Sequence, residues 1–197
     1  MRAMWIGLGM LVLVLISAPV HAATPLETVR TEVNKVLDAL RNKGLKEEAK
    51  KETLRLVYKE MFDQVELAKW SLGGNNWNKF TEAQRQEFVP LFQQVLEKAY
   101  ADKILAYTDE KITFDREVTI TKNRVEVQTR VVTKSKEIPI NYRVVQESDG
   151  TWKVYDVVVE NVSLVMNYRS QFNDILSKNK PEQLLETLRK KVKDQKA

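Results

Sequence analysis

The spacing of apolar residues changes twice along the chain. From Thr24 to about Tyr107 apolar residues recur every three or four positions, as they do on one side of an amphipathic helix. From about Ile112 to Val159 they alternate with polar residues, as in strands that have one dry face. From Leu164 the helical spacing returns. The pattern therefore predicts helices, then strands, then helices.

Local signals place the ends of the first helices. The runs Thr24-Pro25-Leu26-Glu27 and Thr81-Glu82-Ala83-Gln84 are capping boxes, which begin helices. Two further helices are predicted over about 46–62 and 63–72. The run Gly73-Gly74-Asn75-Asn76 predicts a sharp reversal, because these residues tolerate positive φ. Pro90 predicts a kink inside the helix that starts near residue 82.

Four strands are predicted, over about 112–120, 124–131, 138–144 and 151–159. The apolar residues of the first strand, which are Ile112, Phe114, Val118 and Ile120, are predicted to share one face. Lys122-Asn123 and Asp149-Gly150 are the predicted tight turns, and the second has the sequence of a type I′ hairpin. The last strand has bulky residues on both faces, which predicts a central place or a helix over its second face.

The remaining residues read as helices that complete the domain. Ser163 is a plausible N-cap for a helix starting at Leu164, and Pro181 begins a final helix, followed by a solvated tail over 189–196. We predict one α+β domain over 23–197, helical over 23–110 and 161–197, with the sheet over 111–160. In it, helices wrap one face of a curved antiparallel meander of about four strands.

The first 22 residues have the composition of a secretory signal peptide. Arg2 precedes an apolar run from Met4 to Ile16, and small residues end the segment at Ala22. Cleavage there predicts an exported chain of 175 residues. The sequence has no Cys, and its one His is His21, so the exported chain would have neither. It therefore lacks the residues of a Ser-His-Asp triad, a disulfide or a zinc site of the usual type.

Asp156 is the one candidate for acid–base chemistry. It lies between Tyr155 and Val157 in the most apolar predicted strand. Such a residue is either a buried acid with a raised pKa that abstracts protons, as in isomerases built on cone-shaped folds, or a structural carboxylate that accepts hydrogen bonds, which is the commoner case. Two alternative functions therefore stay open. One is a small-molecule isomerase or lyase that uses Asp156 and a tyrosine, and the other is a helical adaptor whose grooves bind only protein.

Two longer strings carry a resemblance to a known family. The run Trp152-Lys153-Val154-Tyr155-Asp156-Val157-Val158-Val159-Glu160-Asn161-Val162-Ser163-Leu164-Val165, with 168–172 after it, resembles the signature of the MlaC family, also called toluene-tolerance proteins. The run from Thr81 to Phe88, with Phe92 and Tyr100 downstream, is similar to that family's central helix. The resemblance covers essentially the whole predicted mature chain, in order.

The resemblance implies a function and a fold. Members of the family are periplasmic phospholipid carriers that shuttle lipid between an outer-membrane lipoprotein complex and an inner-membrane ABC transporter with an MCE-domain ring, which maintains outer-membrane lipid asymmetry. Their fold is similar to the nuclear-transport-factor-like cone, with added helices. The chain is then expected to be a monomer and no enzyme, with bound phospholipid as cargo, no cofactor, no metal and no nucleic acid.

Such a carrier needs a dry cavity for acyl chains, between the sheet and its helices. Periodicity alone does not separate a cavity from a solid core, and without the resemblance it favours a solid core. Arg169 is a candidate for the lipid phosphate, although most arginines in such a position pair with a nearby carboxylate or extend into water. Pro90 predicts a differently bent cavity wall. The residues expected to line the cavity are Phe88, Phe92, Val95, Tyr100, Val127, Val131, Ile140, Tyr142, Val144, Trp152, Val158, Leu164, Val165, Tyr168 and Phe172.

Overall fold

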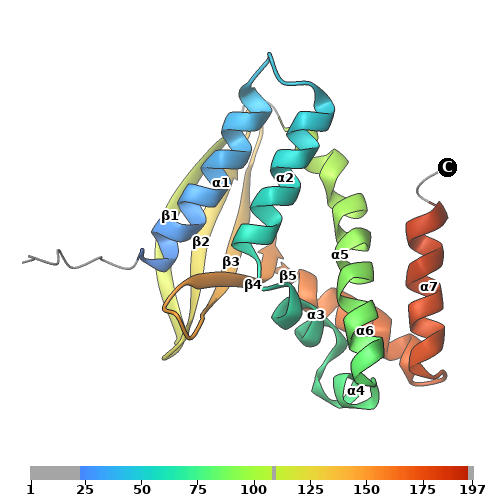
Figure 1. Cartoon of the computed structure of the whole chain (residues 1–197). Helices are drawn as coiled ribbons and strands as arrows, with labels where there is room; N and C mark the ends of the chain where they lie inside the picture. The colour runs from blue at the N-terminus through green and yellow to red at the C-terminus, as the bar shows by residue number, and fades with distance from the viewer. Residues whose placement is uncertain (1–22, 108–109, 195–197) are drawn as a thin grey trace, which may run out of the picture.

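The computed structural model describes residues 23–107 and 110–194 of the 197-residue chain (Figure 1). The predicted signal peptide lies outside the described residues. The N-terminal helices are α1 (Pro25–Arg41), α2 (Glu47–Met61), α3 (Gln64–Leu72), α4 (Gly74–Lys79) and α5 (Glu82–Leu105). The strands follow, as β1 (Lys111–Thr121), β2 (Arg124–Val132), β3 (Glu137–Gln146), β4 (Trp152–Val159) and β5 (Val162–Ser163). Helices α6 (Leu164–Leu176) and α7 (Pro181–Asp194) complete the order.

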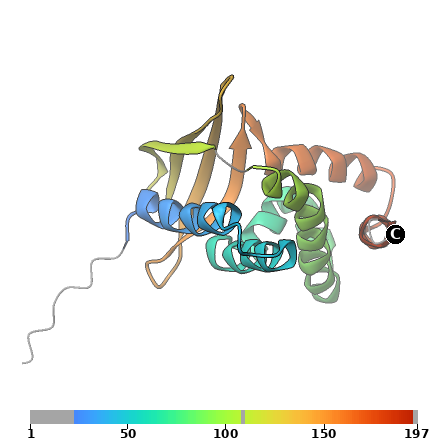
Figure 2. The same cartoon turned by 90° about the horizontal axis from the view of Figure 1, so that it is seen from above.

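The strands form one antiparallel sheet in sequence order, β1-β2-β3-β4-β5. Helices α1 and α2 lie on one face of this sheet, as Figure 2 shows from above. Helix α1 packs on β1 and β2, and α2 packs on β4. The predicted α+β class and antiparallel meander are confirmed, with a two-residue fifth strand added at the edge.

Most of the predicted helix ends are confirmed by their caps. Thr24 and Thr81 form complete capping boxes with Glu27 and Gln84, and the Ser163 hydroxyl accepts a hydrogen bond from an amide in the first turn of α6. Pro90 does not end α5, which runs as one helix through it. Of the four residues predicted to form a reversal after α3, only Gly73 has a positive φ, at +80°. The residues after it form the short helix α4.

Strand β1 carries a bulge that reverses the facing of its later residues. Phe114 and Arg116 pair with consecutive residues of β2, so Asp115 is an additional residue between them. Val118 and Ile120 therefore lie on the opposite face from the two earlier apolar residues of the strand, and both are exposed. The prediction that all four share one face is wrong, because one inserted residue shifts the alternation by one.

The same bulge places a helix cap. With the alternation reversed, Glu117 faces the side of the sheet that α1 covers. Its Oε1 atom accepts a hydrogen bond of 2.7 Å from the amide of Leu26, in the first turn of α1. A carboxylate at this position satisfies a free helix amide and favours the positive end of the helix dipole.

The predicted tight turn at Lys122-Asn123 is confirmed, since these two residues join β1 to β2, but the second predicted turn differs. Only Gly150 of the Asp149-Gly150 pair has positive φ, and the connection is a longer loop closed by a hydrogen bond from the Glu147 amide to the Thr151 carbonyl oxygen. It is therefore not a type I′ turn. Two successive positive φ values, the mark of that turn, occur instead at Glu160 and Asn161, between β4 and β5.

A second bulge explains the unusual composition of β4. Arg143 pairs with Asp156 and the next residue of β3 pairs with Val154, so Tyr155 is the additional residue. Val154, Tyr155 and Asp156 are all buried. Val154 packs toward α1 and α2, while α3 and α6 cover the other face. The prediction of a strand covered on both faces is confirmed.

The helices α3, α5, α6 and α7 enclose a second core that is separate from the sheet. Its centre is a set of aromatic rings, in which Phe92 lies 4.9 Å from Tyr168 and 5.3 Å from Phe172, measured between ring centroids. Leu188 and Val192 of α7 are also buried there, so the predicted solvated tail is helical and partly buried up to Asp194. Within the described residues, no helix is both long and apolar enough to cross a membrane.

This closed core gives a stability prediction. Phe92→Ala is expected to lower the free energy of unfolding by about 3–5 kcal/mol, since Phe92 is only 1% exposed and its ring would leave a cavity. Urea denaturation measures the change. Leu56→Ala is the control on α2, where Leu56 is 50% exposed, and it should stay within about 0.5 kcal/mol. Equal effects of the two substitutions would contradict a closed core around Phe92.

Candidate functional site

The sheet face beneath α1 and α2 is built from rows of apolar side chains that pair across the strands. Residues directly opposite each other share a face. One row, Val125–Val144–Val154, is fully buried against Val29, Val33, Val57 and Met61 of the two helices. The next rows are Val127–Tyr142–Val157, then Thr129–Ile140–Val159, then Val131–Ile138.

The cover over these rows is uneven. Every β2 member of the rows is buried, whereas the β3 and β4 members beyond the first row are half-buried, and Val159 is 39% exposed. We call Ile138, Ile140, Tyr142, Val157 and Val159 the inner apolar surface. It adjoins the buried Val125–Val144–Val154 row at one end and is exposed at Val159 at the other.

Two tyrosines at this part of the fold are desolvated although they are only half-buried. Burial raises the pKa of Tyr142 to about 12, and burial also raises the pKa of Tyr58 on α2. Both side chains nevertheless keep accessible surface. The Tyr58 ring stacks on Phe62 with centroids 4.8 Å apart, which fixes its position.

A shallow, open hollow of about 360 Å³ lies just before β1, lined by Lys103, Ala106, Tyr107 and Glu110, and shares no lining residue with the inner apolar surface. Another, of about 490 Å³, lies between the start of α3 and the β3–β4 loop. No cluster of His, Cys, Asp and Glu within the described ranges could hold a metal ion.

The structure does not gather the fifteen predicted lining residues into one surface. Eight belong to the helical core, of which Phe88, Phe92, Val95, Val165, Tyr168 and Phe172 are buried and Tyr100 and Leu164 are half-buried. Six lie on the sheet face beneath α1 and α2, with Val127, Val131 and Val144 buried and Ile140, Tyr142 and Trp152 half-buried. Val158 lies on the other face of the sheet, opposite Asn141.

Sequence reasoning missed part of the accessible surface. Ile138, Val157 and Val159 were absent from the predicted set. The bulk on both faces of the last strand was a signal for Val157 and Val159. The bulge at Tyr155 decides which of these residues face α2, and nothing in the alternation of the strand indicates an inserted residue.

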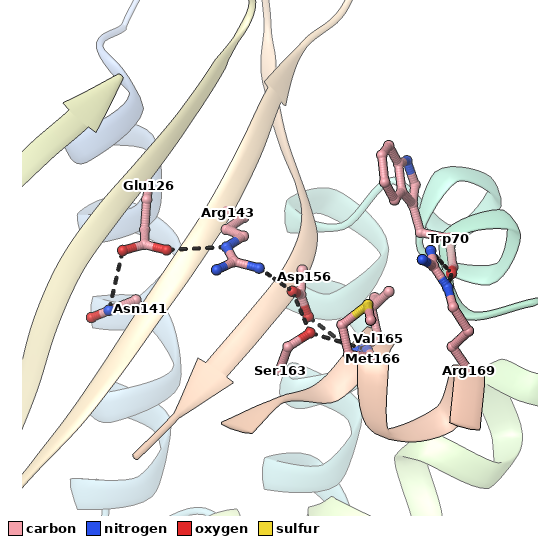
Figure 3. A network of polar contacts seen from close by, with 9 residues as sticks. All are labelled: Trp70, Glu126, Asn141, Arg143, Asp156, Ser163, Val165, Met166 and Arg169. Carbon is pink, nitrogen blue, oxygen red and sulfur yellow. Dashed lines mark hydrogen bonds and ion pairs between the residues drawn. The ribbon is translucent and has the colours of Figure 1, made fainter. Parts of the chain in front are cut away.

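Asp156 is held in a network on the opposite face of the sheet (Figure 3). Its Oδ2 atom accepts hydrogen bonds from the Ser163 hydroxyl at 2.7 Å and from Arg143 Nη1 at 3.1 Å, and its Oδ1 atom accepts one from the Val165 amide at 3.1 Å. Arg143 also pairs with Glu126, at 3.0 Å. This carboxylate joins β4 to the start of α6, which is the geometry of the structural alternative.

Arg169 is also engaged within the protein. Its Nε atom donates a hydrogen bond of 2.7 Å to the carbonyl oxygen of Trp70, and its Nη2 atom donates to the same oxygen. That carbonyl lies in the last turn of α3, where helix carbonyls lack partners of their own. The side chain packs beside Gly73 and fastens the end of α3 to α6. Two of its donors are thereby used within the protein.

Two known proteins are similar to this chain in sequence. The chain is 26% identical over 167 residues to the toluene tolerance protein ttg2D of Pseudomonas putida, covering 81% of this chain and 76% of that one. It is 26% identical over 110 residues to the intermembrane phospholipid transport system binding protein MlaC of Haemophilus influenzae, covering 53% and 51%.

A solved structure shares the fold. It is a phospholipid-binding protein from Ralstonia solanacearum in complex with a phospholipid, with a TM-score of 0.80 at 22% identity over 89% of this chain and 100% of that one. The model of the MlaC protein family matches residues 30–190, which include both strings identified above. The chain therefore belongs to the MlaC family.

Proposed function

We propose that this protein is a periplasmic phospholipid-binding protein of an intermembrane lipid transport system. The relatives named for phospholipid binding and transport support this function, as does the solved complex with a similar fold. The observation that carries it in this chain is the inner apolar surface, whose five side chains share one face of the sheet and are only partly covered, with Val159 39% exposed. We propose that acyl chains lie there, rather than among the closed rings around Phe92.

The energetics of acyl chains suit such a surface. Each methylene buried away from water contributes about 0.8 kcal/mol, so two chains of roughly fifteen carbons represent more than ~20 kcal/mol that a carrier must match. The five side chains of the inner apolar surface carry no charge. Shape and apolar area, rather than a reaction, then hold the cargo, and no cofactor is required.

Membership of the family supports a proposal for the partners of this protein. We propose that the protein exchanges lipid with an outer-membrane lipoprotein complex and with an inner-membrane ABC transporter that carries an MCE-domain ring. A passive carrier responds only to differences in affinity, so direction must come from an energised partner. The saturated hydrogen bonds of Asp156 favour carriage over the isomerase alternative.

Native mass spectrometry of the purified protein tests the proposal. Protein prepared from the periplasm without detergent is expected to show added mass equal to phospholipid, and lipid extraction should return the same species. Stripped protein incubated with phospholipid vesicles should regain that mass. Protein that carries no phospholipid in either preparation would contradict the proposed function.

A further inference from the structure

The clearest group left unexplained by lipid binding is Arg124, at the start of β2. It lies on the sheet face opposite the inner apolar surface, in line with Glu126 and Arg130. Its guanidinium carbon is 4.6 Å from the ring centroid of Trp70 and 5.5 Å from that of Tyr155. Two aromatic faces therefore hold this guanidinium in place.

The donors of Arg124 have no partner among the described residues. Its Nε atom is buried without a hydrogen bond, and the side chain takes part in none of the ion pairs of the described chain. An arginine is always charged, and the two Nη atoms of Arg124, which are neither hydrogen-bonded nor fully buried, stay open to a group from outside the chain, whereas the enclosed Nε atom does not. Two other outward-facing arginines of the sheet have carboxylate partners: Arg130 pairs with Asp115 and Glu137, and Arg143 pairs with Glu126 and Asp156.

The surroundings add positive charge with limited compensation. The guanidinium carbon of Arg169 lies 5.7 Å from the same Trp70 ring, and Figure 3 shows Arg169 beside Trp70. Against the opposing effect of burial, hydrogen bonds from Lys69 and Trp70 lower the pKa of the Glu66 carboxyl, and the nearby charge of Arg124 adds to this lowering. Both oxygens of Glu66 are already hydrogen-bonded, one by Lys69 and one by the Trp70 indole. Glu66 therefore offsets part of the charge without pairing with Arg124.

We propose that Arg124, stacked on Trp70 and Tyr155, binds a phosphate-type oxyanion at a site separate from the inner apolar surface. The planar fork of a guanidinium matches the oxygens of such an anion and binds them in a bidentate manner. Stacking presets the fork and reduces the entropy lost on binding. The anion is either free phosphate or the phosphate of a lipid headgroup at a membrane surface.

The side-chain Nε–H signal of Arg124 in NMR spectra of the ¹⁵N-labelled protein tests this site. Titration with inorganic phosphate should shift the signal saturably, whereas chloride at equal ionic strength should not. Arg124→Lys keeps the charge and loses the fork, and should lose the saturable response, followed through the Trp70 indole signal. Glu66→Gln removes a neighbouring negative charge and should tighten binding roughly five-fold.

Arg130→Gln is the matched control, because it removes an arginine from the same face of the same strand whose guanidinium is already paired. It should leave the titration unchanged. Sedimentation with vesicles containing phosphatidylglycerol then identifies the source: binding lost in Arg124→Lys assigns a headgroup, and binding retained assigns free phosphate. A phosphate response no different from chloride overturns the proposal, and lipid content measured on the same sample shows separately whether the carrier function stands.

Discussion

Ile140→Trp is expected to reduce the phospholipid bound per protein molecule by at least about ten-fold. Ile140 is a half-buried member of the inner apolar surface, paired with buried Thr129 on one side and accessible Val159 on the other. An indole there would occupy space that we assign to acyl chains. Because the position is not fully enclosed, the loss of stability should stay near the low end of the 1–3 kcal/mol typical of overpacking. Lipid extraction and thermal melting measure the two effects.

Two substitutions on the same sheet separate blocking from unfolding. Val118→Trp adds the same bulk to the exposed opposite face of β1 and should change neither lipid content nor melting temperature. Val127→Trp adds it at a side chain with no exposed surface and should unfold the protein or destabilise it strongly. A folded Ile140→Trp protein that retains its full lipid content would exclude the inner apolar surface as the acyl-chain site.

Most helices and strands of this fold could be predicted because the signals that set them lie close together in the sequence. The two capping boxes and the Ser163 cap each act within one helical turn, and each forms as predicted. The buried row of β2 follows from strict alternation over 125–131. Such features depend on neighbours three or four positions away, so no knowledge of the tertiary structure is needed.

Single inserted residues account for most of the errors. Asp115 in β1 and Tyr155 in β4 each shift the alternation of side chains by one, which exposes Val118 and Ile120 and changes which valines face α2. Asp115 pairs with Arg130 across the strands, at 2.8 Å, so a cross-strand ion pair accompanies the bulge. Tertiary pairing therefore selects the bulges, and the alternating pattern does not encode them.

The candidate site was only half predictable for a related reason. An apolar residue facing inward has the same periodicity in a solid core and beside a recess. Phe92 and Tyr142 were therefore placed together, yet Phe92 is enclosed by other rings, while Tyr142 remains accessible. The difference arises because α1 and α2 cover β2 and the near end of β4 more completely than they cover β3.

Asp156→Asn is expected to lower the free energy of unfolding by about 2–4 kcal/mol. The side chain of Asp156 is 2% exposed and accepts from Arg143, Ser163 and the Val165 amide, so an amide nitrogen would face donors in place of an acceptor. Removing one member of a buried ion pair costs about 3–5 kcal/mol, and the partial exposure of Arg143, at 34%, reduces that cost. Urea denaturation measures the loss.

Asp115→Asn provides the comparison, because Asp115 also pairs with an arginine across two strands but lies at the surface, where such pairs contribute about 0–1 kcal/mol. If Asp156 were instead a catalytic acid, Asp156→Asn would abolish turnover of a substrate while leaving stability close to the Asp115→Asn value. The opposite outcome, a large loss of stability with unchanged lipid per folded molecule, identifies Asp156 as the joint between β4 and α6. That joint sets where α6 begins and so fixes one edge of the sheet on which lipid is proposed to lie.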